Sequence, residues 1–107
     1  MNIEGNITGI YKITSPSGKI YIGSSKNIKN RLSRYKNLHC KEQFRIYNSL
    51  KKYGFYSHKF EVIEECVEKD LYIRERHYQE LYDCIGKNGL NCVLVRTDVK
   101  PPIYTEE

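Results

Sequence analysis

The strongest constraint on the fold of this 107-residue chain is a pair of β-favouring segments separated by a turn sequence. Residues 8–14 are rich in Ile, Tyr and Thr, which favour strands. Residues 15–18 read Ser-Pro-Ser-Gly, which is typical of a tight turn because proline fixes φ and glycine accepts positive φ. Residues 19–23 then return as a second strand. The sequence therefore predicts a β-hairpin with a four-residue loop.

The rest of the chain alternates between helical and extended patterns. Ser24 and Ser25 are candidate N-caps of a first helix, and Gly54 fits the position just after a second one. The expected order β-β-α-α-β-α-β defines an α+β domain, a small and mainly antiparallel sheet flanked by three helices. The domain is expected to span residues 1–96, with a short flexible tail at 97–107. We predict helices at residues 26–36, 42–53 and 68–83, a strand at 59–64, and a short final strand or extended segment at 90–95.

The spacing of apolar residues indicates which face of each helix is buried. Glu75 interrupts the apolar stripe of the third predicted helix, because positions 71, 75, 78 and 82 share one helical face. A carboxylate in an apolar stripe is costly unless it is paired, hydrogen-bonded or metal-bound. Glu75 is therefore a candidate for a specific role. The predicted stripes are Ile28, Leu32 and Tyr35 in the first helix, Phe44, Tyr47 and Leu50 in the second, and Leu71, Tyr78 and Tyr82 in the third.

The composition favours a partner that carries phosphate groups. Lys and Arg total 18 against 13 Asp and Glu, which gives a formal charge of +5. Aromatic residues make up 12% of the chain, and ten of them are tyrosines. A small, basic, tyrosine-rich domain is typical of nucleic-acid binding, although a solvated lysine surface produces the same charge.

The cysteines and the hydropathy pattern indicate the compartment. Cys40, Cys66, Cys84 and Cys92 form no CxxC pair and lack a histidine at zinc spacing, so reduced thiols are expected. No apolar run approaches the length of a membrane span, and the N-terminus lacks the apolar region of a signal peptide. We expect no membrane partner and a cytoplasmic protein, or a nuclear one in a eukaryote, that is not secreted.

Two tyrosines occupy matching places in the predicted hairpin. Gly9-Ile10-Tyr11 lies on its first strand and Tyr21-Ile22-Gly23 on its second. Strands joined by a short turn are neighbours, so both phenols can reach one site. The alternative is a cross-strand aromatic pair with a structural role only.

These tripeptides resemble those that give the GIY-YIG nuclease superfamily its name. Both are intact, about ten residues apart as in that family, and precede a predicted helix that contains Arg31. The resemblance extends over residues 7–95. It implies a DNA endonuclease that hydrolyses phosphodiester bonds with one divalent metal ion, Mg²⁺ with Mn²⁺ as a substitute.

The resemblance assigns further site residues one by one. It places Arg31 on the scissile phosphate, and a guanidinium can grip a phosphate bidentately. Tyr35, one turn later, corresponds to a position where the family has His or Tyr; its hydroxyl either positions water or phosphate, or its ring is a core anchor. Glu75 corresponds to the metal-binding glutamate, with Glu64 and Glu80 as alternatives. Asn91 matches an asparagine expected to tie the glutamate helix to the hairpin.

The implied mechanism gives each of these groups a task. Tyr11 is the general base and Tyr21 orients the water or the phosphate. Arg31 neutralises charge that develops on the phosphate, and Glu75 holds the metal. Because free tyrosine has a pKa near 10, a neighbouring cation is needed to lower the pKa of Tyr11. The candidates for this cation are Lys12, Lys19 and Lys26.

Basic residues around the expected site are candidates for contacts with the DNA backbone. Some family members carry a further histidine between the first two helices, and His39 lies in that region without matching its offset. No separate DNA-reading domain is expected, so the chain either cuts with little sequence preference, or is a fragment, or relies on a transient dimer or a separate targeting partner. The DNA-binding candidates are Lys26, Lys29, Arg34, Lys36, Arg45, Lys51 and Lys52.

Two other functions fit parts of the sequence. A catalytically silent nucleic-acid-binding module on the same fold would be indicated by loss of Arg31 or Glu75, and both are present. A small protein-interaction domain could use the tyrosines as a binding face, because tyrosine is enriched at interfaces. That second alternative leaves the spacing of the two tripeptides unexplained.

Overall fold

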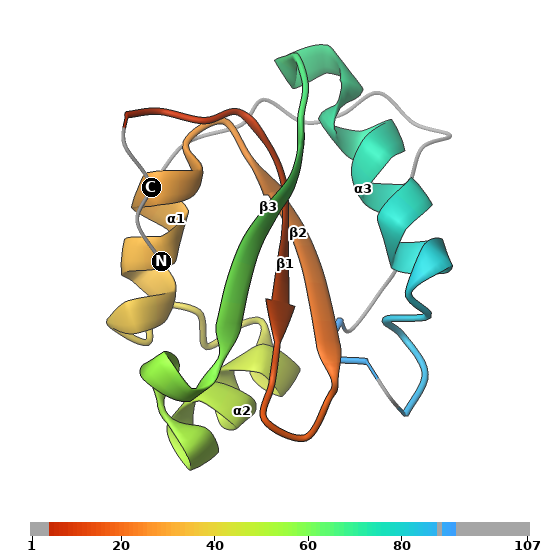
Figure 1. Ribbon diagram of the computed structural model, residues 1–107. Helices are drawn as coiled ribbons and strands as arrows, with labels where there is room; N and C mark the ends of the chain where they lie inside the picture. The colour runs from red at the N-terminus through yellow and green to blue at the C-terminus, as the bar shows by residue number, and fades with distance from the viewer. Residues whose placement is uncertain (1–4, 88, 92–107) are drawn as a thin grey trace.

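A computed structural model describes residues 5–87 and 89–91 as three layers, with a sheet between helices (Figure 1). The sheet has three antiparallel strands in the order β2-β1-β3. Helices α1 and α2 cover one face, and α3 covers the other. The elements are β1 (Gly9–Thr14), β2 (Ile20–Ser25), α1 (Ile28–Lys36), α2 (Phe44–Tyr53), the 3₁₀ turn η1 (Phe55–Ser57), β3 (Lys59–Glu65), the 3₁₀ turn η2 (Glu68–Asp70) and α3 (Leu71–Leu81).

This arrangement confirms the predicted α+β class and the order of its elements as far as α3. Gly89 then forms a parallel bridge with Ile20, so the chain after α3 returns to the free edge of β2. The rest of the predicted final strand and the proposed tail at 97–107 lie outside the described residues. No helix in the described part is both long and apolar enough to cross a bilayer.

The hairpin between β1 and β2 turns at the predicted residues, but its loop has five residues, 15–19, instead of the predicted four. The Ser15 amide donates to the Lys19 carbonyl at 2.9 Å, and Gly18 adopts φ of +87°. The prediction that Ser24 and Ser25 cap α1 is wrong, because both residues continue β2. The cap is Asn27, whose side chain accepts a hydrogen bond from the Asn30 amide at 3.0 Å. Strand pairing with β1 holds the serines in an extended conformation.

Alternation along the strands divides the core into two clusters. On the α1 and α2 face, Tyr11 and Ile13 pack with Tyr21 and residues of both helices. On the α3 face, Ile10 and Ile22 pack against Leu71 and Cys84. Successive side chains of a strand point to opposite faces, so a three-layer domain needs apolar residues at consecutive positions. The Ile-Tyr and Tyr-Ile pairs of the hairpin satisfy this requirement.

Helix α2 differs from its predicted packing. Its buried residues are Ile46, Ser49 and Leu50, whereas Phe44 is 55% exposed. The predicted stripe is wrong at Phe44, whereas its other members, Tyr47 and Leu50, pack with Ile46 in the core. The buried His58 fixes the end of α2, with its ring nitrogens 2.8 Å from Ser49 Oγ and from the Gly54 carbonyl.

The described cysteines are free thiols in apolar surroundings. Cys40 and Cys84 are buried and Cys66 is partly buried, while Cys92 lies outside the described residues. Burial raises the pKa of Cys40 to about 11 and that of Cys84 to about 12. These thiols are therefore protonated near neutral pH and behave as small apolar residues.

Candidate active site

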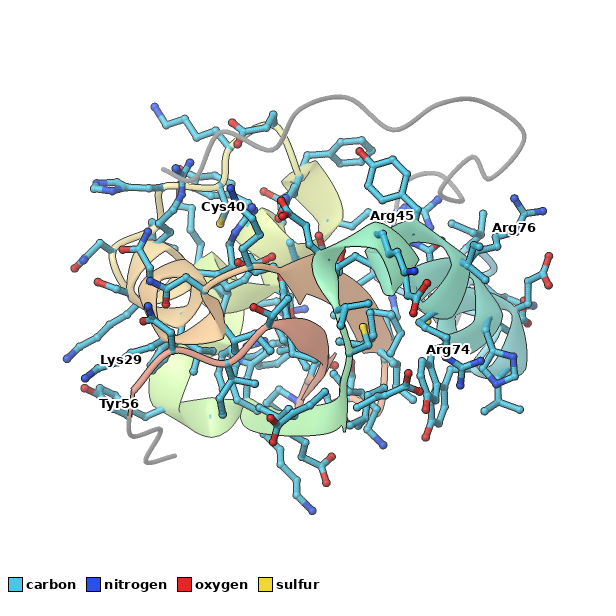
Figure 2. The ribbon with its side chains drawn as sticks, turned by 90° about the horizontal axis from the view of Figure 1, so that it is seen from above. Lys29, Cys40, Arg45, Tyr56, Arg74 and Arg76 are labelled. Carbon is cyan, nitrogen blue, oxygen red and sulfur yellow. The ribbon has the colours of Figure 1, made fainter. Side chains whose placement is uncertain are left out.

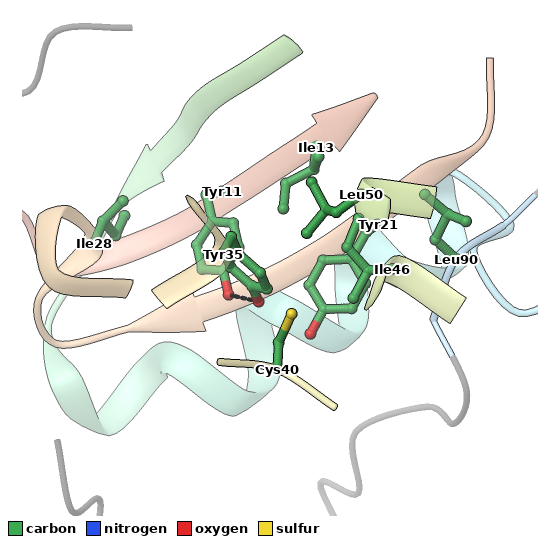
Figure 3. Packing of buried hydrophobic residues seen from close by; sticks show 9 residues of the cluster. All are labelled: Tyr11, Ile13, Tyr21, Ile28, Tyr35, Cys40, Ile46, Leu50 and Leu90. Atoms are coloured by element: carbon green, nitrogen blue, oxygen red, sulfur yellow. Dashed lines mark hydrogen bonds between the residues drawn. The ribbon is translucent and has the colours of Figure 1, made fainter. Parts of the chain in front are cut away.

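Three tyrosine side chains converge between the sheet and α1 (Figure 3). Tyr11 comes from β1, Tyr21 from β2 and Tyr35 from α1. The hydroxyls of Tyr11 and Tyr35 are 2.6 Å apart, and each pair of rings has centroids between 5.9 and 6.3 Å apart. Tyr35 is fully buried, so its ring is a core anchor while its hydroxyl belongs to the tyrosine cluster. The geometry thus supports the core-anchor alternative for Tyr35, and a role of its hydroxyl in positioning water or phosphate stays a prediction.

The glycines of the two tripeptides provide the space for this cluster. A β-carbon at Gly23 would collide with the ring of Tyr11, its register partner across the hairpin. A β-carbon at Gly9 would collide with the Glu64 carbonyl, where β1 approaches β3 closely next to a register shift. Each glycine is therefore required by a neighbouring strand rather than by its own backbone angles.

Burial makes the phenols of the cluster harder to ionise. It raises the pKa of Tyr11 and of Tyr35 well above that of free tyrosine, and it raises the pKa of Tyr21 as well. Arg31 on α1 opposes this effect and lowers the pKa of Tyr11 and Tyr21. The cation whose charge favours ionisation of Tyr11 is therefore Arg31 of the adjoining helix.

None of the lysines predicted to serve Tyr11 is placed there. Lys12 lies on the opposite face of the sheet, 3.5 Å from Glu61 and 4.7 Å from the centre of the Tyr82 ring. Lys26 pairs with Glu68 at 3.6 Å, and Lys19 is exposed at the turn. The prediction failed because adjacent residues of a strand point to opposite faces, which separates Lys12 from Tyr11.

Glu75 on α3 is a half-buried carboxylate at the edge of β2. Ser24 Oγ donates a 2.5 Å hydrogen bond to its Oε1. Burial raises the pKa of Glu75 to about 7, against the opposing effects of Ser24 and of Arg31. Glu75 in turn raises the pKa of Tyr11 and Tyr21, so its charge acts on the tyrosine cluster.

The alternative acidic residues are engaged in ion pairs. Glu64 accepts hydrogen bonds of 2.8–3.0 Å from Arg74 and one of 2.8 Å from the Tyr78 hydroxyl. Arg74 lowers the pKa of Glu64. Glu80 pairs with Arg76 at 2.8 Å. Both arginines lie on α3 (Figure 2). Glu75 therefore differs from the other two in that its charge acts on Tyr11 and Tyr21 and is itself influenced by Arg31.

The donor set around Glu75 suits a hard divalent cation. A carboxylate, a serine hydroxyl and nearby phenols offer oxygen atoms, the ligand type that Mg²⁺ prefers. A cation here would also offset the cost of burying an ionised carboxylate, because opposite charge favours the charged form. Among the described residues no group of three or more His, Cys, Asp or Glu gathers at metal-binding distance. Glu75 is thus a single-carboxylate candidate.

Asn91 closes the free edge of β2. Its Oδ1 accepts from the Ile22 amide and its Nδ2 donates to the Ile22 carbonyl, both at 2.8 Å. The Leu90 amide donates to the Ile20 carbonyl at 2.8 Å, so residues 90 and 91 continue the hydrogen bonding of the sheet. The predicted link between the end of α3 and the hairpin is therefore made by this amide.

The predicted DNA-contacting residues divide into two groups. Arg45 is a structural clamp, because its Nη1 donates to the carbonyls of Ile85 and Asn91 at 2.7 and 2.9 Å. Arg34 donates to the His39 carbonyl at 3.1 Å, and the His39 side chain is exposed. Lys29 projects outward from α1 (Figure 2). The exposed lysines that remain as candidates are Lys29, Lys36, Lys51 and Lys52.

Two residues of the site were not identified from the sequence. The sequence predicts Ser24 as a helix cap, whereas strand alternation from Ile22 places it on the α3 face with Glu75. Gln43 accepts a hydrogen bond from the Tyr35 hydroxyl at 3.1 Å. Nothing in the local sequence indicates Gln43, because this contact depends on how the segment between α1 and α2 folds back.

The fold and the two tripeptides define a known class of catalytic domain. Residues 7–91 match the family described as GIY-YIG catalytic domain, and the chain belongs to that family. It is similar to the catalytic domain of the intron endonuclease I-TevI in its E75A mutant, numbered as in that protein, with a TM-score of 0.70 and 26% identity over 84% of this chain and 97% of that one. A second structure, the catalytic domain of the homing endonuclease I-TevI, gives a TM-score of 0.68 and 25% identity over 80% and 98%. No match was found among curated proteins.

Proposed function

We propose that this chain is a divalent-metal-dependent DNA endonuclease that hydrolyses phosphodiester bonds. The observation that carries the proposal is that Glu75 of α3 and Arg31 of α1 both act electrostatically on a tyrosine cluster drawn from β1, β2 and α1. Membership of the GIY-YIG family and the similarity to an endonuclease catalytic domain support it. A carboxylate, a guanidinium and phenols together can bind a phosphodiester and activate water.

Each side chain has a distinct part in the proposed reaction. Tyr11 accepts a proton from the attacking water, as the general base. Arg31 binds the scissile phosphate and stabilises the charge that develops on it, since a guanidinium stays protonated at any working pH. Tyr21 orients the water or the phosphate from the neighbouring strand. The products are a 5′-phosphate and a 3′-hydroxyl.

Glu75 would hold the metal ion, with the Ser24 hydroxyl orienting its carboxylate. A bound Mg²⁺ or Mn²⁺ would supply Lewis-acid stabilisation of the leaving 3′ oxygen. Asn91 keeps the edge of β2 in place, so that Tyr21 and Ser24 on that strand keep their positions relative to α3.

Lysines beside the site would bind the DNA backbone. Lys29 and Lys36 lie one heptad apart on α1, and Lys51 and Lys52 lie in the last turn of α2. None of the four has an acidic partner within the part of the chain that the structure describes, so their charges are available to phosphates. A single site of this kind cuts one strand, so a double-strand break needs a second copy or sequential nicking.

The test is the conversion of supercoiled plasmid in Mg²⁺ and in EDTA. We expect nicking by the wild type in Mg²⁺ and its loss in EDTA, in Glu75→Ala and in Arg31→Ala. Glu80→Gln is the matched control, because it neutralises a carboxylate on the same helix that is paired away from the site. Activity that persists in Glu75→Ala would refute the assignment of the metal ligand.

A branched duplex is the second substrate if plasmid is left intact. Binding to both substrates without cleavage in Mg²⁺ or Mn²⁺ would refute the endonuclease and support the catalytically silent module. Binding is measured in the same buffers by fluorescence anisotropy of labelled DNA, so the two functions give different results.

A further inference from the structure

The hydroxyl of Tyr35 lies between two hydrogen-bond partners from different parts of the chain, and the Tyr21 side chain also interacts with it. The Tyr11 hydroxyl is 2.6 Å away on one side, and Gln43 Oε1 is 3.1 Å away on the other. Gln43 is held by its backbone, since its amide donates to the Cys40 carbonyl and its carbonyl accepts from the Tyr47 amide, both at 2.9 Å. Gln43 precedes α2 as its N-cap, yet its side chain makes no capping bond and points to Tyr35 instead.

The chemistry of these groups fixes the direction of the hydrogen bonds. A phenol has one proton to donate, and an amide oxygen can only accept. Tyr35 therefore donates to Gln43 Oε1 and accepts from the Tyr11 hydroxyl. The proton of Tyr11 is then directed at Tyr35, so Tyr11 is the donor in the neutral pair.

We infer that Gln43 is a positioning residue that sets the direction of the Tyr11–Tyr35 hydrogen bond and, through it, the readiness of Tyr11 to act as a base. This inference rests on the proposed function of Tyr11. Gln43 touches no reacting group and acts only through the Tyr35 hydroxyl.

A Tyr11 phenolate would need a hydrogen-bond donor, and Gln43 affects whether Tyr35 can be that donor. When Tyr11 gives its proton to hydroxide in solvent, a water molecule forms and the phenolate requires a donor. Tyr35 can supply it only by turning its proton away from Gln43 and towards Tyr11. The phenolate then takes a proton from the attacking water and returns to the neutral phenol. Gln43 competes for the Tyr35 proton and so holds Tyr11 in its protonated form.

Two substitutions at position 43 should act in opposite directions. Gln43→Leu removes the acceptor, which frees the Tyr35 proton for the phenolate. Gln43→Glu supplies a stronger acceptor and a negative charge, which retains that proton and opposes the phenolate. The other groups that face Tyr11 stay the same in both variants: Tyr21 from β2, Arg31 and Tyr35 from α1, and Glu75 from α3.

The measurement is the pH dependence of plasmid nicking in Mg²⁺ between about pH 6 and pH 10. The rising limb should move to lower pH in Gln43→Leu and to higher pH in Gln43→Glu, by about one pH unit each. Glu42→Gln, the adjacent exposed position, is the control and should leave the limb in place. A loss of rate in both variants with no shift, or shifts in the same direction, would overturn the inference.

A second measurement separates this inference from the proposed function. In ¹³Cζ-tyrosine NMR spectra taken in EDTA, the Tyr11 resonance is assigned from its absence in Tyr11→Phe. Its ionisation should begin at lower pH in Gln43→Leu than in the wild type, and an unchanged position would overturn the inference. If Tyr11→Phe still cuts DNA, the assignment of Tyr11 as base fails, while the NMR result still decides whether Gln43 controls its proton.

Discussion

The ring of Tyr11 on β1 lies directly over Gly23 on β2, its partner in the strand register. A β-carbon at position 23 would overlap the end of that ring. The tyrosine of the first tripeptide and the glycine of the second therefore form one structural unit across the hairpin. Their relationship explains why the two tripeptides occur together, and it leads to the first prediction.

Gly23→Ala should displace Tyr11 from the cluster. The added methyl group must push the phenol aside in a closely packed core, which costs about 1–3 kcal/mol of unfolding free energy. Nicking should fall roughly tenfold or more, because a displaced base loses its alignment. Gly86→Ala is the control, since the atoms nearest to its β-carbon would belong to the side chain of exposed Asp83, which can move aside. Wild-type nicking by Gly23→Ala would contradict the placement of Tyr11.

Asn91→Leu should destabilise the domain through the edge of β2. The amide and carbonyl of Ile22 would lose both partners in a buried position, which costs about 2–4 kcal/mol. Urea unfolding followed by circular dichroism measures the loss. Asn48→Leu, at an exposed position of α2, should change the unfolding free energy by much less. Equal effects of the two substitutions would show that the edge contact is unimportant.

Glu75 should make the metal-free protein less stable as the pH rises. Its pKa is about 7 in the folded chain against a usual 4.5, so the folded state binds this proton more tightly than the unfolded state. Stability from this group is complete below pH 4.5 and is lost as the pH rises through 7. In EDTA, the unfolding free energy of Glu75→Gln should therefore match that of the wild type near pH 4. Near pH 8 it should exceed the wild-type value by about 1–3 kcal/mol.

The comparison of the two proteins at each pH isolates Glu75 from other groups. Glu64 contributes in the opposite sense, since Arg74 lowers its pKa and its stabilisation is lost in acid. That contribution is the same in the wild type and in Glu75→Gln, so it cancels. Thermal melting in EDTA across this pH range provides the measurement, and a constant difference between the two proteins would contradict the raised pKa of Glu75.

DNA binding should depend steeply on salt concentration. If about five phosphates are neutralised, the logarithm of affinity should fall with that of salt at a slope near −4.5. Lys29→Ala should reduce this slope by about one and leave stability unchanged. Arg45→Ala should lower the melting temperature because it releases the carbonyls of Ile85 and Asn91. Anisotropy titrations of Glu75→Ala in EDTA give the slopes, and a slope near zero would show that the exposed lysines do not form the DNA-binding surface.

The sequence by itself determined the hairpin, the order of the elements and the residues that resemble a catalytic set. These features depend on short-range rules, namely turn chemistry, strand alternation and helical spacing. Helical spacing also identified Glu75, because it places a carboxylate on an otherwise apolar helix face, where burial of the charge is costly. Each tripeptide contains a glycine that a neighbouring strand requires, because a β-carbon there would collide with that strand.

The tertiary structure decided which charges and hydroxyls meet. Lys12 lies next to Tyr11 in the sequence but on the other face of the sheet, whereas Arg31 reaches the tyrosines from α1. Arg45 became a clamp, and Gln43 became the partner of Tyr35. Such contacts join segments that are distant in the chain, so no local pattern encodes them. Burial then set the pKa values of the phenols and of the carboxylate, because the loss of solvation depends on everything packed around a group.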